Sequence, residues 1–189
     1  MEVKIVPIAY HIDRSNTLYE GQSLELTPLT NLTEGEKQLK IIGLDQISHH
    51  AYNTVVAYHN TNFANTISFD QVNCAQMEKY LEIIRQLYFS SYPSRLMCLY
   101  SAKDIKSLKV WIEYLKLDEG YNVWEIGYDA SKTVELDAYF LRANTLKNPF
   151  DFESLIKYWR GQISNNPLVE LLIPLPVKVL RQVDVSHFI

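Results

Sequence analysis

The chain has 189 residues, of which 47% are hydrophobic and 21% are charged, and its formal net charge at pH 7 is -4. This length fits a single domain over residues 1–189, and the apolar content predicts a packed core and argues against disorder. The negative net charge provides no general attraction for nucleic acid, although it allows a local basic patch.

The chain shows no signal for a membrane or for an oxidising compartment. No apolar run reaches the length of a membrane span, and residues 1–12 lack the long apolar core of a secretion signal. Cys74 and Cys98 lie in unrelated contexts and form neither a disulfide framework nor a metal-ligand spacing. We therefore expect a cytoplasmic protein with no membrane partner, unless it is secreted as an effector by a route that needs no such signal.

The first third of the chain changes pattern several times. Residues 3–13 have the composition of a strand, and Glu20-Gly21 marks a turn. Residues 31–40 are polar and predict a loop. Residues 44–60 place apolar side chains at helical spacing and predict a helix, and residues 60–70 have loop composition.

The middle of the chain predicts two amphipathic helices around a strand. The first helix covers residues 72–89, with one apolar face formed by Met77, Leu81, Ile84 and Tyr88. A short strand follows Pro93 and ends at Tyr100. The second helix covers residues 102–120, with an apolar stripe of Ile105, Leu108, Ile112 and Leu115 and with Gly120 as its cap.

The last third predicts mostly strands. Residues 121–129 and 132–143 have strand patterns, and a short helix begins near Asp151. Residues 167–185 supply one or two further strands. Short strands interrupted by helices, without regular βαβ alternation, predict an α+β fold with a mixed or antiparallel sheet.

Three strand residues are candidates for a functional site: His11, Tyr100 and Glu170. Glu170 lies in the apolar run "VELLIP", where a carboxylate costs free energy unless it faces water or has a partner. Each residue also has an ordinary interpretation. His11 would be a structural histidine, Tyr100 one of 13 tyrosines, and Glu170 a solvent-facing residue on an edge strand.

The order of these residues resembles the ADP-ribosyltransferase superfamily, in its histidine–tyrosine–glutamate branch. "AYHID" is similar to that branch's first strand, with Tyr10 flanking the histidine, and Gly21 follows at "LYEGQ". "LMCLYSAKDIKSLKVW" is similar to the motif in which a tyrosine ends a strand just before a helix. "VELLIPLPVKVL" is similar to the late strand that carries the glutamate.

The resemblance implies a fold, a substrate and residue roles. It implies a split mixed or antiparallel sheet with flanking helices around an NAD cleft. Glu170 would hold the nicotinamide ribose and face its developing positive charge, as carboxylates do in glycoside hydrolysis. Tyr100 would stack on nicotinamide, and His11 would bind the adenosine-side ribose. NAD would serve as a substrate, with no metal.

The sequence departs from the arginine-modifying members of this superfamily. Those members carry Glu or Gln two residues before the catalytic glutamate, where this chain has Leu168, and they have a Ser-x-Ser motif that is missing here. Arginine is therefore not the expected acceptor. The branch that the chain resembles includes poly(ADP-ribose) polymerase and diphtheria-toxin-like catalytic domains, and the overall layout suggests a less-studied bacterial branch.

Four residues near the motifs complete the predicted NAD site: Tyr10, Asp13, Arg14 and Arg95. Arg95 could bind a diphosphate with two hydrogen bonds, although an exposed arginine before a strand is the commoner case. Asp13 and Arg14 could line the cleft, or they could form a local ion pair in a turn. Asp137 could have a lid or supporting role.

A metal site is not expected. His49 and His50 are adjacent on a predicted helix and so point in different directions, and His59 lacks a histidine partner four residues away.

The leading functional hypothesis is a mono-ADP-ribosyltransferase that uses NAD to modify a protein or nucleic-acid acceptor. It could be a toxin, an effector or a defence component, with a cognate antitoxin or immunity protein as a further partner. The alternative is a catalytically inactive module of the same fold that binds proteins. RNA 2′-phosphotransferase chemistry ranks lower, because no cluster of basic residues is visible. The leading hypothesis requires His11, Tyr100 and Glu170 to meet at one accessible pocket.

Overall fold

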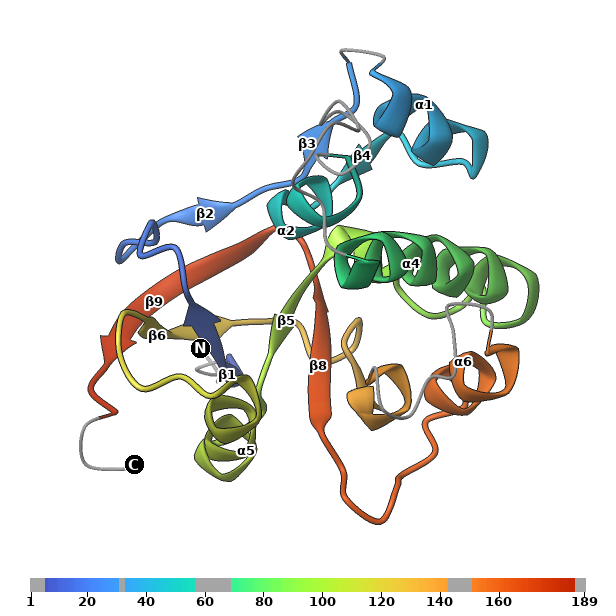
Figure 1. The fold of residues 1–189 in the computed structure, drawn as a ribbon. Helices are drawn as coiled ribbons and strands as arrows, with labels where there is room; N and C mark the ends of the chain where they lie inside the picture. Colours follow the sequence, from blue (N-terminus) through green and yellow to red (C-terminus); the bar gives the residue numbers. More distant parts are fainter. Residues whose placement is uncertain (1–5, 31–32, 57–68, 143–150, 186–189) are drawn as a thin grey trace.

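The computed structural model describes residues 6–30, 33–56, 69–142 and 151–185, with only the backbone described over residues 69–73. It is an α+β fold whose strands all pair antiparallel (Figure 1). The strands are β1 (Ile8–Asp13), β2 (Ser23–Leu24), β3 (Thr27–Pro28), β4 (Gln46–Ile47), β5 (Cys98–Ser101), β6 (Asn122–Gly127), β7 (Val134–Asp137), β8 (Val169–Pro174) and β9 (Val177–Val183). The helices are α1 (Glu34–Ile41), α2 (His49–Ala51), α4 (Phe69–Tyr88), α5 (Ile105–Leu115) and α6 (Phe152–Trp159). Within the described ranges, no helix combines the length and the hydropathy that crossing a membrane requires.

Two sheets meet at the centre of the molecule. One has the strand order β1-β6-β9-β2 and the other the order β5-β8-β7. They join where Tyr10 and Ala102 exchange backbone hydrogen bonds of 2.7 and 2.8 Å. Figure 1 shows β1, β6 and β9 on one side and β5 and β8 on the other. This junction brings the first strand of the chain beside strands that follow it by many residues.

Strand β8 is buried on both faces, which explains its nearly continuous apolar sequence. Leu171 and Ile173 pack in one cluster with Ala9 and Trp124 of the four-stranded sheet. Leu172 points the other way, into the cluster beneath α4 and α6. Because side chains alternate along a strand, Glu170 shares the face of Leu172.

Two helices cover that face of the three-stranded sheet. Their buried side chains form one cluster with the sheet: Met77, Leu81, Ile84, Leu155, Tyr158 and Trp159. The indole of Trp159 is fully buried and donates a 3.0 Å hydrogen bond to the carbonyl of Leu81, which joins α6 to α4. The predicted face of α4 is confirmed except at its end, where Tyr88 is 72% exposed.

Helix α5 packs on the outer face of β1 and β6. Leu108 and Ile112 are buried there with Val123, and Tyr10 and Ile12 pack against them. Its predicted end was wrong, because Lys116 rather than Gly120 forms the left-handed cap, at φ 52°.

Residues 31–40 were predicted to be a loop, and this was wrong for residues 34–40, which lie in α1, while residues 31–32 are outside the described part. Thr33 caps α1, since its hydroxyl accepts from the backbone of Glu36 while the Glu36 carboxylate accepts from the backbone of Thr33. This reciprocal pair is a capping box, which the Thr-x-x-Glu spacing encodes. The predicted helix over 44–60 is shorter than expected and is divided into β4, α2 and a π-helical turn at Tyr52–Val56, with residues 57–60 outside the described part.

Asp137 anchors the segment that leads into β8. It is fully buried and is the last residue of β7. The strand predicted over residues 132–143 therefore ends earlier than expected, since residues 138–141 form a 3₁₀ turn. Its carboxylate accepts three backbone hydrogen bonds of 2.8–2.9 Å, from Tyr139, Ser164 and Leu168. The acid among apolar neighbours therefore holds the chain two residues before Glu170.

We expect Asp137→Ala to lower the free energy of unfolding by about 3 kcal/mol or more, because buried backbone donors would lose their acceptor. Chemical denaturation measures this loss. Asp129→Ala is the matched control, since Asp129 caps an exposed turn through Ser131 and should lose less than about 1 kcal/mol. Equal losses in the two variants would contradict an anchoring role for Asp137.

Candidate functional site

A buried arginine lies at the centre of the candidate site. Arg95 is 6% exposed and begins the 3₁₀ turn that leads into β5. Its guanidinium donates to both carboxylate oxygens of Glu78 on α4, at 3.1 and 3.0 Å. The third nitrogen donates to Glu170 on β8 and to the hydroxyl of Tyr158 on α6. One guanidinium thus links a turn, two helices and a strand.

Two aromatic rings enclose this arginine. The guanidinium carbon lies 4.6 Å from the centre of the Tyr100 ring and 5.1 Å from that of Tyr158. Burial alone would lower the pKa of Arg95, but the adjacent carboxylates of Glu170 and Glu78 raise it well above its ordinary value. Burial also raises the pKa of both tyrosines, so their hydroxyls stay protonated.

The buried group carries an excess of negative charge. Arg95 contributes one formal positive charge, while Glu78 and Glu170 contribute one negative charge each. Within the described chain, only one oxygen of Glu170 is hydrogen-bonded, and it accepts from Arg95 and, at 2.8 Å, from Tyr158. The set is therefore formally one charge negative, with one carboxylate oxygen still able to accept a hydrogen bond.

A second buried acid positions the segment that carries Arg95. Glu82, one turn after Glu78 on α4, is 1% exposed. Its carboxylate binds the guanidinium of Arg85 at 2.7 and 3.0 Å and the hydroxyl of Ser94 at 2.7 Å. Because Ser94 directly precedes Arg95, α4 positions both the 3₁₀ turn, through Glu82, and the Arg95 side chain, through Glu78.

His11 connects the first sheet to this group. Its Nδ1 lies 2.8 Å from the carbonyl oxygen of Tyr100, across the junction between β1 and β5. A carbonyl can only accept, so Nδ1 carries the proton and Nε2 is left as an acceptor in the neutral ring. Burial lowers the pKa of His11 by more than the Tyr100 carbonyl and Asp13 raise it. The ring of His50 meets Tyr100 edge-on, at 5.0 Å between ring centres.

The three predicted residues are therefore linked, but not as a single open pocket. Tyr100 joins them, since His11 binds its backbone while its ring covers the arginine that holds Glu170. The expectation that Glu170 would be accessible was wrong, because Glu170 is 3% exposed and paired with Arg95. His11 and Glu170 also fail to share a face. His11 follows the face of Ala9, while Glu170 points toward α4 and α6.

The other predicted NAD-site residues have separate surroundings. Tyr10 points toward α5, away from His11. Asp13 is 3% exposed and accepts hydrogen bonds from the backbone of Ser15 and Leu18, at 3.0 and 2.9 Å. Burial would raise the pKa of Asp13, but these hydrogen bonds outweigh it and lower the pKa. Asp13 thus holds the turn after β1, and it forms no ion pair with the exposed Arg14, both being in the described ranges.

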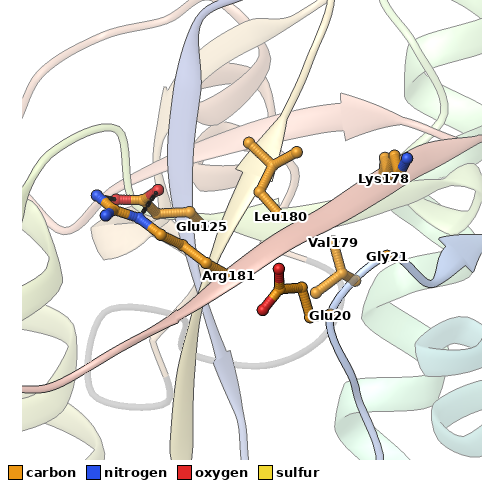
Figure 2. A pocket seen from close by; sticks show the side chains of 7 residues that line it. All are labelled: Glu20, Gly21, Glu125, Lys178, Val179, Leu180 and Arg181. Atoms are coloured by element: carbon orange, nitrogen blue, oxygen red, sulfur yellow. Dashed lines mark hydrogen bonds and ion pairs between the residues drawn. The ribbon is translucent and has the colours of Figure 1, made fainter.

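Two shallow surface hollows of the described structure lie away from these residues. Figure 2 shows one of about 350 Å³, lined by Glu20, Gly21, Glu125 and residues 178–181. Arg181 there pairs with Glu125 at 2.7 Å. The second, of about 520 Å³, lies between residues 118–123 and 182–185. Neither is lined by His11, Tyr100 or Glu170, so the predicted dinucleotide pocket is not among them.

No group of three or more metal-ligating side chains occurs among the residues whose placement is described. The Nε2 of His49 instead lies 3.1 Å from the Asn53 amide, and His59 is outside the described residues. Two residues of the arginine group were missed from the sequence, Glu78 and Tyr158. Their only signal is that each adjoins an apolar helix stripe, which does not distinguish them from ordinary surface residues.

The matching family model spans nearly the whole fold. Residues 9–185, from β1 to the end of β9, match the family described as a protein of unknown function, DUF2441. The chain belongs to this DUF2441 family. A search of curated proteins found no match. The arginine-centred group and the β1–β5 junction both lie inside the matched range.

We expect Arg95→Met to lower the free energy of unfolding by about 3–5 kcal/mol, because it leaves two buried carboxylates without their cation. Denaturant titration measures this effect. Arg160→Met is the matched control, since Arg160 is exposed and its loss should cost less than about 0.5 kcal/mol. A loss below about 1 kcal/mol for Arg95→Met would contradict the central role of the cation.

We also expect stability to fall as the pH drops below about 6.5, in part because of His11. The lowered pKa keeps His11 neutral in the folded state, while the unfolded chain takes up a proton. The unfolded state therefore binds more protons, and acid favours it. His11→Gln should give a shallower decline between about pH 7.5 and 5.5. The exposed His49→Gln should keep the original slope, and identical slopes in both variants would exclude His11 as a source.

Proposed function

We propose that this DUF2441 chain is an NAD-dependent mono-ADP-ribosyltransferase with an ADP-ribosyltransferase-like fold. The observation that carries the proposal is the linked set of His11, Tyr100 and Glu170 at the junction of two sheets. The three residues come from β1, β5 and β8, in the chain order that the resemblance requires. The split between the four-stranded and three-stranded sheets agrees with the sheet that the resemblance implies.

The electrostatics of the arginine group suit this chemistry. Transfer breaks the bond between the ribose and nicotinamide, and nicotinamide leaves with the bonding electrons. An acceptor nucleophile then bonds to the same carbon and loses its proton. The ribose becomes positively charged on the way, and the net negative charge of Glu78, Arg95 and Glu170 would stabilise that charge in a water-poor setting.

Two further groups have matching chemistry. The neutral His11 ring offers Nε2 as an acceptor for a ribose hydroxyl, because its Nδ1 proton is used by the Tyr100 carbonyl. Tyr100 offers an aromatic face next to the negative group, which favours a flat cation such as the nicotinamide ring. Glu170 would use the oxygen that the described residues leave without a hydrogen bond. Tyr100 and Tyr158 would have to move aside for NAD to reach it.

One observation favours the second candidate, a catalytically inactive module of the same fold. Glu170 is 3% exposed and already bound to a cation, which is the arrangement of a structural ion pair. In that case the order of these residues would serve only the fold, and the chain would act by binding another protein. The two candidates differ in whether NAD is consumed.

We expect Glu170→Gln to reduce nicotinamide release from NAD by about 10²–10³-fold, because the amide cannot offset the developing charge. Release is measured by chromatography with purified protein and NAD. Glu135→Gln is the matched control, since Glu135 lies on the neighbouring strand β7 but is exposed and paired with Lys103. It should retain wild-type release.

The same assay distinguishes the transferase from the catalytically inactive module. A wild-type protein that releases no nicotinamide with any protein or nucleic-acid acceptor, and that fails to bind NAD, would exclude the transferase. A loss of less than about tenfold in Glu170→Gln would show that another residue stabilises the transition state.

A further inference from the structure

A second arginine, outside the buried group, has an unusual setting. Arg142 follows the 3₁₀ turn Ala138–Leu141, and its guanidinium carbon lies 4.2 Å from the ring centre of Tyr114 and 5.2 Å from that of Tyr139. Its Nε is buried and has no hydrogen-bond partner. In the described part of the chain, the Arg142 side chain forms no ion pair. Arg142 is thus a cation held by two aromatic rings, and its guanidinium donates no hydrogen bond to any other described residue.

Unused guanidinium donors indicate a ligand with two oxygens. Both rings contact the guanidinium through its π-system, which leaves the in-plane N–H groups to bind an oxyanion. A carboxylate or a phosphate fits this geometry with two parallel hydrogen bonds. A buried donor without a partner costs free energy, and such a ligand would remove that cost.

The surface beside Arg142 distinguishes between the two oxyanions. Lys106, Val110 and Tyr114 follow one another at four-residue spacing on α5, so they form one stripe along the helix. Val110 is 37% exposed and Tyr114 is 41% exposed, and Lys106 is exposed as well. A phosphate backbone with a stacked base suits this surface, which offers the cations Arg142 and Lys106 and the aromatic ring of Tyr114. A carboxylate side chain offers nothing for the aromatic surface to stack on.

This stripe is connected to the start of the strand that carries Glu170. Tyr114 meets Trp111 edge-on at 5.9 Å between ring centres, and the Trp111 indole donates a 2.7 Å hydrogen bond to the carbonyl of Val169. Val169 directly precedes Glu170. In Figure 1, α5 lies beside the end of β8 at which this strand begins, on the side opposite to α1.

We propose that Arg142, Tyr114 and the α5 stripe bind single-stranded nucleic acid, which serves as the ADP-ribose acceptor. Arg142 binds a phosphate through its planar edge, and Tyr114 stacks on a neighbouring base with the ring face that Arg142 does not cover. The role of the nucleic acid as the ADP-ribose acceptor rests on the proposed transferase function, whereas the binding of nucleic acid at this site does not. The negative net charge of the chain allows such binding, because the interaction depends on a local group of cations.

The test measures binding in the absence of NAD. Fluorescence anisotropy follows labelled single-stranded DNA and RNA of about 12 nucleotides, titrated with wild-type protein at several salt concentrations. The variants are Arg142→Ala, Arg142→Lys and Tyr114→Ala. Lys37→Ala is the control that also removes one exposed positive charge, from α1 at the opposite end of the molecule. Thermal melting of every variant verifies folding. If Arg142→Ala does not fold, Arg142→Lys replaces it as the variant that tests the role of the guanidinium.

We expect Arg142→Ala to weaken binding about tenfold and to reduce the slope of log K against log salt by about 0.7. Arg142→Lys should keep the slope but lose affinity, because an ammonium cannot bind a phosphate through two parallel bonds. Tyr114→Ala should weaken binding about tenfold with an unchanged slope, since it removes stacking rather than charge. Lys37→Ala should behave as the wild type.

Three results would overturn the inference. They are no binding of either oligonucleotide by the wild type, equal binding by Arg142→Ala and Lys37→Ala, and displacement of the oligonucleotide by a glutamate-rich peptide at similar concentration. Each of these leaves the nicotinamide-release assay unaffected. Binding that depends on Arg142 in a protein that releases no nicotinamide would support the nucleic-acid site and exclude the transferase.

Discussion

The fold depends on one buried cation. Arg95 begins the 3₁₀ turn that leads into β5, and its side chain binds three elements: Glu78 of α4, Tyr158 of α6 and Glu170 of β8. The three charges of Arg95, Glu78 and Glu170 are costly to remove from water unless their hydrogen bonds are well satisfied, so this group restricts how the helices can pack on the sheet. A shift of α4 or α6 across the sheet would break bonds that no apolar contact replaces. The group therefore supplies orientation as well as stability.

The junction between the sheets transmits this constraint to the start of the chain. Tyr100 lies on β5, five residues after Arg95, and its ring covers the guanidinium while its carbonyl accepts a hydrogen bond from His11. Two residues after Tyr100, Ala102 pairs with Tyr10, which directly precedes His11. The first sheet is thus attached to the second through a short backbone contact, one histidine and the apolar packing of Leu171 and Ile173 against Ala9 and Trp124. A ligand that changed the position of Tyr100 would disturb both sheets at their point of contact.

The sequence predicted regular elements well where one physical signal dominated. The apolar faces of α4 and α5 and the run of β8 follow from periodicity alone, and Asp151 was expected to begin α6, as its bond to Ser154 confirms. The loop assigned to 31–40 failed because polar composition outweighed the Thr33–Glu36 spacing. The strand past Asp137 failed because its carboxylate binds backbone groups from a loop distant in sequence.

The site was only partly predictable for the same reason. Order along the chain brought His11, Tyr100 and Glu170 to attention, but it could not reveal that Arg95 pairs with Glu170 or that Glu78 and Tyr158 complete the group. In sequence, Arg95 lies 75 residues from Glu170, 17 residues from Glu78 and 63 residues from Tyr158. Charge pairing across such distances depends on helix placement, which periodicity does not specify. Arg95 was considered either as a diphosphate ligand or as an exposed arginine because its carboxylate partners were unknown, and the exposed alternative is wrong, since Arg95 is 6% exposed.

The most direct test of the account is saturation-transfer difference NMR of NAD with the wild-type protein and with Tyr100→Ala. If NAD binds at the junction, the nicotinamide protons receive strong saturation in the wild type and lose it in the variant, while the adenosine-side ribose keeps part of its signal through His11. An absence of saturation on any NAD proton in the wild type would contradict the account. Equal nicotinamide signals in both proteins would place NAD away from Tyr100, and they would contradict it as well.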